Sequence, residues 1–139
     1  MKFSPNASPI LLATLLLAAC GAKTSDEQQV RALIDEVETA AEARDASDVL
    51  EHVAETYTDS GGLDKTQLRH FLRGYFLAHP RLELAVNIES LEFPVDGLAQ
   101  AVISVTTVEL TDPNLQRLKV EFRRSGSAWQ VARVERVGR

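Results

Sequence analysis

The spacing of apolar residues changes once along this chain, at Pro80, and that change limits its fold more than any other feature. Before Pro80 the apolar residues recur every three or four positions, as they do along one face of an α-helix. After Pro80 they alternate with polar residues, as they do along a β-strand with one buried face. Helices followed by strands bury their apolar faces by packing as two layers. The pattern therefore predicts an α+β domain.

The part before Pro80 predicts three helices. Ser25 is a suitable cap for the first. Its apolar stripe falls at positions i, i+3, i+4 and i+7, which are Val30, Leu33, Ile34 and Val37. A second, shorter helix is expected to begin at Ser47 and to close at Tyr57, before a glycine-containing loop at 58–62. A third helix is expected from about Asp64 until Pro80 stops it.

The part after Pro80 predicts four antiparallel strands. The apolar residues of the first strand are Leu82, Leu84, Val86 and Ile88. The apolar positions then shift by one, to Leu91 and Phe93, and a single extra residue near 89–90 accounts for this shift. A β-bulge is therefore expected there. Clusters of turn-forming residues place turns at 94–97, 111–114 and 125–127, with strands at about 98–110, at 118–122 and from 129 onward.

Length and composition limit the kinds of site. The chain has 139 residues, 45% of them hydrophobic, which suits one globular domain. Its single cysteine, Cys20, excludes an intramolecular disulfide framework and a cysteine-rich zinc or iron–sulfur site. The net charge of −5 gives no general basic surface for nucleic acid, so no nucleic-acid partner is expected. No motif indicates a cofactor.

Residues 1–19 are expected to be a signal peptide. The apolar run at 10–19 reaches only about half of a roughly 30 Å hydrocarbon core, so it is too short to span a membrane. The four residues Leu17, Ala18, Ala19 and Cys20 resemble the bacterial lipobox. This resemblance implies cleavage before Cys20 and a diacylglyceryl thioether on its sulfur, usually with an acylated (palmitate-type) amine. The alternative is an ordinary secreted protein with a free cysteine.

The lipoprotein interpretation fixes the expected organisation and location. Residues 20–25 form a lipidated tether, and residues 26–139 form the domain. The protein is then anchored to a cell membrane and faces the periplasm or the exterior. Gly21 stands where an aspartate commonly signals inner-membrane retention, so the sequence resembles an outer-membrane lipoprotein if the host is Gram-negative.

The order of the elements resembles the nuclear transport factor 2-like superfamily. The residues that carry the resemblance are the opening amphipathic helix, the break at 57–62, the bent strand and the final hairpin at 120–131, and it spans 26–137. It implies a cone in which N-terminal helices pack on a curved antiparallel sheet of about four strands, with a pocket between them. Some members are enzymes, such as ketosteroid isomerase and scytalone dehydratase, whereas others only bind ligands or proteins.

Two pairs of residues are candidates for lining such a pocket. Tyr57 and Asp59 lie where the helical layer opens, and a carboxyl group beside a phenol could serve general acid–base catalysis. The alternative gives Tyr57 a core position and Asp59 an Asx-type turn before two glycines. Arg133 and Glu135 follow Trp129 at every second position and so fall on the same face of the predicted strand. They either line the outer part of the pocket or pair across the sheet.

Other charged residues give weaker signals. His52, His70 and His79 have no partners at metal-ligand spacing, so neither a metal site nor a catalytic histidine is expected. Residues 22–60 carry three basic and eleven acidic side chains, and residues 117–139 carry seven basic and two acidic ones. The basic segment is a surface for anionic lipid headgroups or an acidic partner, the solvated outer face of the sheet, or the partner of an acidic helix in the same domain.

The sequence thus predicts a non-catalytic module that binds a ligand or an envelope protein. The alternative is a pocket enzyme of the isomerase or dehydratase type that acts on a small apolar substrate. A homodimer formed through the outer face of the sheet is a further expectation, with Val102, Thr106 and Val108 at the interface.

Overall fold

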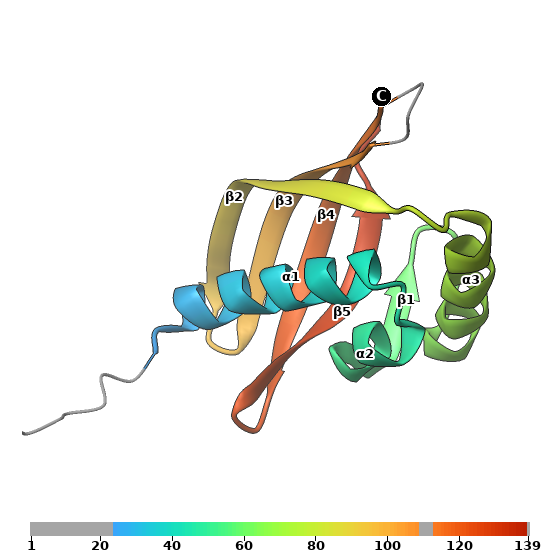
Figure 1. Cartoon of the computed structure of the whole chain (residues 1–139). Helices are drawn as coiled ribbons and strands as arrows, with labels where there is room; N and C mark the ends of the chain where they lie inside the picture. Colours follow the sequence, from blue (N-terminus) through green and yellow to red (C-terminus); the bar gives the residue numbers. More distant parts are fainter. Residues whose placement is uncertain (1–23, 109–112, 139) are drawn as a thin grey trace, which may run out of the picture.

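The computed structural model describes residues 24–108 and 113–138. Three helices and five strands follow one another in the order α1 (Asp26–Glu42), α2 (Ala46–Glu51), β1 (Val53–Asp59), α3 (Lys65–Ala78), β2 (Glu83–Val95), β3 (Leu98–Val108), β4 (Asn114–Ser125) and β5 (Ala128–Arg136). The long helix α1 crosses the inner face of the curved sheet, whereas α2 and α3 lie beside β1 at one end of it (Figure 1). The α+β class predicted from the change of periodicity is confirmed.

Capping side chains set the starts of the helices. The Ser25 hydroxyl accepts from the Gln28 amide, and the Gln28 side chain accepts from the Ser25 amide, so α1 begins with the capping box that favours helix nucleation. Asp64 and Gln67 form the same box at the start of α3. Helix α2 begins earlier than expected, because Asp45 rather than Ser47 is its cap.

The second predicted helix is wrong in its later part. Helix α2 ends at Glu51, and Val53–Asp59 forms a strand instead of a helix closed by Tyr57. This strand pairs parallel to β5, with Val53 beside Val131 and Asp59 beside Val134. β-Branched and aromatic residues such as Val53 and Tyr57 favour a strand wherever a neighbouring edge offers hydrogen bonds. The sheet therefore has five strands, in the order β1-β5-β4-β3-β2, and not four.

The predicted bulge in the first antiparallel strand is confirmed. Ile88 lies opposite Ile103 and Ser90 lies opposite Val102, which leaves Glu89 as the extra residue. Leu91 therefore returns to the inner face, opposite Ala101. The predicted turn at 94–97 is also present, since β2 ends at Val95 and β3 begins at Leu98 around Gly97, whose φ is +76°. The turn at 125–127 uses Gly126 in the same way, and residues 111–112 of the third turn lie outside the described residues.

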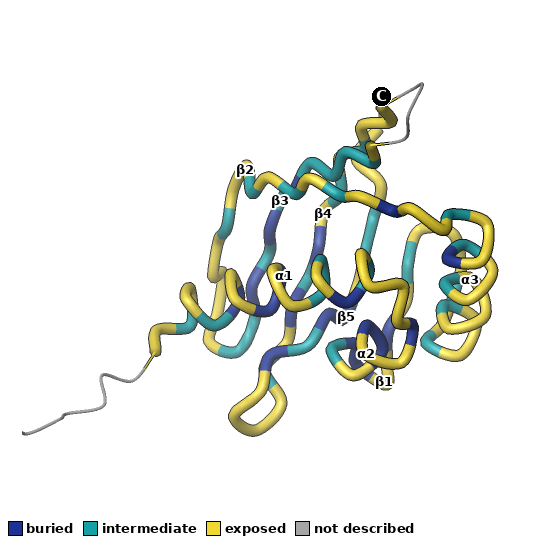
Figure 2. The backbone as a smooth tube through the Cα atoms, viewed as in Figure 1, coloured by how far each residue is buried: buried dark blue, intermediate teal, exposed yellow. Residues whose placement is uncertain are grey.

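The main core lies where α1 covers the sheet. Val30, Leu33 and Ile34 are buried from the helix side. From the sheet they meet the inward residues Ala99, Ala101, Ile103, Val120, Phe122, Trp129 and Val131, all of them buried. Dark segments in Figure 2 follow this band across the strands. We call this region, where α1 covers residues 99–103, 120–122 and 129–131, the closed half of the domain.

One ion-pair group ties the final hairpin to the start of the domain. The Arg124 guanidinium lies 3.2 Å from Asp26 on α1 and 2.7 Å from Asp96 in the β2–β3 turn. Its carbon Cζ also lies 5.5 Å from the centre of the Trp129 ring. Arg124 is thus one basic residue of the 117–139 segment that pairs with the acidic first helix, which is one of the roles expected for this segment.

Candidate functional site

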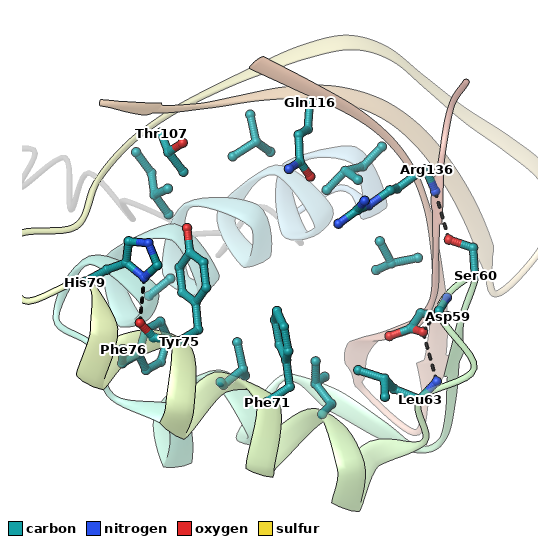
Figure 3. Close-up of a pocket in the computed structure, with 18 of the residues that line it drawn as sticks. Asp59, Ser60, Leu63, Phe71, Tyr75, Phe76, His79, Thr107, Gln116 and Arg136 are labelled. Carbon is teal, nitrogen blue, oxygen red and sulfur yellow. Dashed lines mark hydrogen bonds between the residues drawn. The ribbon is translucent and has the colours of Figure 1, made fainter. Parts of the chain in front are cut away.

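A cavity of about 840 Å³ lies at the other end of the sheet, between α3 and the strand ends. The inner face of the sheet continues there beyond the part that α1 covers, and α3 lies across the cavity from it. Its inward positions are Val105 and Thr107 on β3, Asn114, Gln116 and Leu118 on β4, and Val134 and Arg136 on β5. From the opposite side, α3 contributes Leu68, Phe71, Leu72, Tyr75 and Phe76 (Figure 3). We call this region the open half.

The lining changes from apolar to polar toward the strand ends. On the inner face of the sheet, Ile103 in the closed half pairs with Leu118. The next pair toward the strand ends is Val105 with Gln116, and the last is Thr107 with Asn114. The deep part of the cavity is therefore apolar, and its outer part offers amide and hydroxyl groups. Such a cavity favours a ligand with an apolar body and a polar end.

Tyr57 and Asp59 both line this cavity, on adjacent inward positions of β1. The Tyr57 hydroxyl donates to Asp59 Oδ2 at 3.0 Å. Asp59 Oδ1 accepts from the backbone amides of Gly61, at 2.9 Å, and Leu63, at 3.0 Å. The Asp59 carboxylate therefore closes the loop between β1 and α3 in the manner of an Asx turn. This arrangement matches the structural alternative for the pair.

These bonds decide what the pair can do chemically. Burial, followed by the hydrogen bond to Asp59 and the charge of that carboxylate, raises the pKa of Tyr57. The phenol is therefore held in its neutral form and is a poor general base. Asp59 already accepts three hydrogen bonds, which leaves little of it for a proton transfer to a ligand.

Arg133 and Glu135 do not line the cavity, which corrects the expectation for them. In β5, Val131 lies opposite Phe122 and Arg133 lies opposite Glu121, so Ala132 is an extra residue in the strand. This bulge reverses the alternation after Val131. Arg133 and Glu135 consequently pair with each other, with 2.6 Å between guanidinium nitrogen and carboxylate oxygen, while Val134 and Arg136 take the inward positions.

Arg136 is the functional candidate that the sequence pattern missed. Its backbone amide donates to Ser60 Oγ at 3.2 Å, which fixes the end of β5 beside the loop after β1. Its side chain points into the cavity beside Gln116 (Figure 3). The signal that could have found it is the buried Ala132 directly after the buried Val131, since two adjacent buried positions in a strand mark a bulge.

The three histidines are spread over the domain. His79 lines the cavity, stacks on Tyr75 with 4.0 Å between ring centres, and places Nδ1 2.8 Å from the Tyr75 carbonyl oxygen. His52 lies 3.7 Å from Glu36 on α1, and His70 is exposed on α3. Within residues 24–108 and 113–138, no three His, Cys, Asp or Glu side chains gather in a way that could hold a metal ion.

Two further observations concern the membrane. In the described part of the chain, none of the helices combines the length and the apolar composition needed to cross a bilayer. Cys20 and the expected signal peptide at 1–19 lie outside the described residues.

Comparison with known proteins identifies the fold. No protein-family model and no curated protein matches the sequence. Among solved structures, a cystatin-like domain of unknown function from Nostoc punctiforme is similar, with a TM-score of 0.71 at 14% identity over 84% of this chain and 78% of that one. A nuclear transport factor 2-like protein of unknown function from Shewanella oneidensis gives 0.66 at 14% identity, over 81% and 98%. One from Pseudomonas putida gives 0.64 at 17% identity, over 84% and 89%.

Proposed function

We propose that the protein is a lipid-anchored binding module of the cell envelope whose open half takes up a small ligand without transforming it. The observation that carries the proposal is the cavity of about 840 Å³ with apolar walls and a polar outer part. A cavity of this volume is large enough for a drug-sized molecule. The fold shared with the solved structures is compatible with this role.

The state of the polar side chains supports binding over catalysis. Enzymes of this fold type need a titratable group free to exchange a proton with the substrate. The carboxylate in the cavity, Asp59, is engaged by Tyr57 and by two backbone amides. The isomerase or dehydratase alternative therefore lacks a free general base at this position.

The placement of the tether supports access to the cavity. Helix α1 starts at the end of the domain away from α3 (Figure 1), and the cavity lies beside α3. The six residues 20–25 extend to at most about 20 Å. An acyl chain on Cys20 would thus hold the α1 end toward the membrane and leave the open half turned away from it. We place the protein on the outer membrane if the host is Gram-negative.

Anchoring is tested with the full chain expressed in a bacterial host. The expected result is that the wild-type protein partitions into the detergent phase of a phase-separating detergent and that Cys20→Ser partitions into the aqueous phase. Recovery of both proteins in the same phase would contradict the lipid anchor.

Ligand uptake is tested by non-denaturing mass spectrometry of the purified full chain. We expect a bound small molecule on the wild type and its loss in Val105→Phe, which fills the cavity from β3. Val102→Phe, on the other face of the same strand, is the matched control and should keep the ligand. An equal ligand content in all three proteins would contradict binding in the open half.

Association through the sheet remains a proposal of its own. Val102 and Thr106 are half-buried on the outer face of β3, and Val108 is exposed there. If this face joins two copies, replacement of Val102 by Lys should give a folded monomer by light scattering.

A further inference from the structure

We infer that the open half selects a carboxylate-bearing amphiphile and that Arg136 is the residue that recognises the carboxylate. This inference rests on the proposed function and adds to it the chemical class of the ligand. Four features of the cavity carry it: the state of the Arg136 side chain, its position, the groups that suit a carboxylate, and the apolar surface opposite.

The first feature is a guanidinium without a partner in the described chain. Most other arginines of the sheet pair with carboxylates: Arg117 with Glu89, Arg123 with Glu121, Arg124 with Asp26 and Asp96, and Arg133 with Glu135. Within residues 24–108 and 113–138, the Arg136 side chain forms neither an ion pair nor a hydrogen bond. Its backbone is nevertheless held firmly, by Ser60 and by pairing with Leu118.

The second feature is the position of this cation. The Arg136 side chain points into the cavity from the sheet, next to Gln116 (Figure 3). Apolar walls lower the local dielectric constant, so a charge in a cleft attracts an opposite charge more strongly than it would on an open surface. Asp59 lies in the same cavity, but its two oxygens are taken up by Tyr57 and the loop amides. Within the described residues it forms no ion pair with the Arg136 guanidinium.

The third feature is the shape of the complementary ligand. Guanidinium presents two parallel N–H donors that match the two oxygens of a carboxylate. The Gln116 amide lies beside the Arg136 side chain and can hydrogen-bond to the same group. One cation suits a singly charged carboxylate better than a phosphate, which carries more charge and needs more donors.

The cavity also offers an apolar surface for the rest of the ligand. Phe71 lines the cavity from α3 and is 54% exposed, and it stacks on Tyr75 at 5.9 Å between ring centres. Leu68 and Leu72 flank it along the helix, and Val105 and Val134 face it from the sheet. An acyl or aromatic body placed here would bury Phe71 while its carboxylate reaches Arg136.

The test compares two pairs of probes that differ in charge but not in size: 3-phenylpropionate with 3-phenylpropionamide, and octanoate with octanamide. The full chain is incorporated into phosphatidylcholine vesicles, and binding of each probe is measured by equilibrium dialysis. Vesicles without protein give the blank. We expect at least one carboxylate to bind about ten-fold or more tightly than its amide, as a charge-assisted hydrogen bond predicts.

Two variants assign the effect to a residue. Arg136→Gln should lower the carboxylate affinity to that of the amide and leave the amide affinity unchanged. Arg133→Gln removes the same charge from the same strand outside the cavity and should change neither. If carboxylate and amide bind equally, or if Arg136→Gln has no effect, the inference fails while the proposed function stands. If none of the four probes binds, the inference is overturned, and the mass-spectrometric comparison with Val105→Phe decides the proposed function separately.

Discussion

The closed and open halves are built from the same strands but differ in how a helix packs against their inner face. In the closed half, each inward residue of β3 and β4 meets a side chain of the core cluster that includes Val30, Leu33 and Ile34 of α1. In the open half, the same alternation continues through Val105 and Gln116, but α3 stands off and leaves a cavity. Figure 2 shows the contrast, since buried residues follow α1 whereas α3 is mostly exposed or half-buried.

The difference teaches where stability and binding reside. Close packing in the closed half holds the sheet in place, including the strand ends that line the cavity. The open half contributes fewer buried side chains, and on α3 only Phe76 is buried. Its apolar surface remains available to a ligand. Substitutions should therefore divide into those that unfold the domain and those that alter the cavity.

The largest expected effect comes from truncating aromatic side chains in each half. Phe122 is 1% exposed in the closed half, so Phe122→Ala should lower the free energy of unfolding by about 3–5 kcal/mol. Phe71, in the open half, is 54% exposed, and Phe71→Ala should lower it by less than about 1 kcal/mol. Urea unfolding followed by circular dichroism measures both. Equal losses would show that the two halves do not differ in this way.

A smaller effect is expected from enlarging side chains. Ala101 is 1% exposed under α1, and Ala101→Phe should cost about 1–3 kcal/mol or more because no space receives the ring. Val105 is four residues further along the strand on the same face and borders the cavity, so Val105→Phe should leave stability within about 0.5 kcal/mol of the wild type. Thermal unfolding compares the two, and a severe loss in Val105→Phe would mean that the cavity is closed in solution.

The smallest effect concerns the contact between β1 and the loop that borders the cavity. Tyr57→Phe removes the hydrogen bond to Asp59 and should cost about 0.5–1.5 kcal/mol at pH 7. The pKa of Tyr57 is raised in the folded protein above its unfolded value of about 10. The neutral phenol therefore contributes stability that is complete below pH 10 and is lost as the pH rises beyond it.

The measurement is the difference in free energy of unfolding between wild type and Tyr57→Phe, taken from pH 7 to pH 11. Lysine titration affects both proteins alike, so the difference isolates Tyr57. We expect the difference to shrink at alkaline pH. A difference that is constant over this range would contradict a buried, neutral phenol.

Several parts of the molecule follow from local sequence. Each of these features is encoded by residues that are close together in the sequence. They are the caps at Ser25 and Asp64, the apolar stripe of α1 and the bulge at Glu89. Their causes are local hydrogen bonds and the periodicity of a single helix or strand, so residue type and spacing over a short stretch are enough to indicate them. The α+β class followed from the order of these elements.

Tertiary structure decided the rest. Val53–Asp59 became a strand because the free edge of β5, far along the chain, offers it parallel hydrogen bonds. The bulge at Ala132 turned Arg133 outward and Arg136 inward, because β5 pairs with β4 on one side and with β1 on the other and must bend to satisfy both. The sequence by itself thus determined α1, α3, the antiparallel strands and the apolar faces of β2, β3 and β4. Which side chains share the cavity depended on strand pairing between distant segments, and no local pattern encodes it.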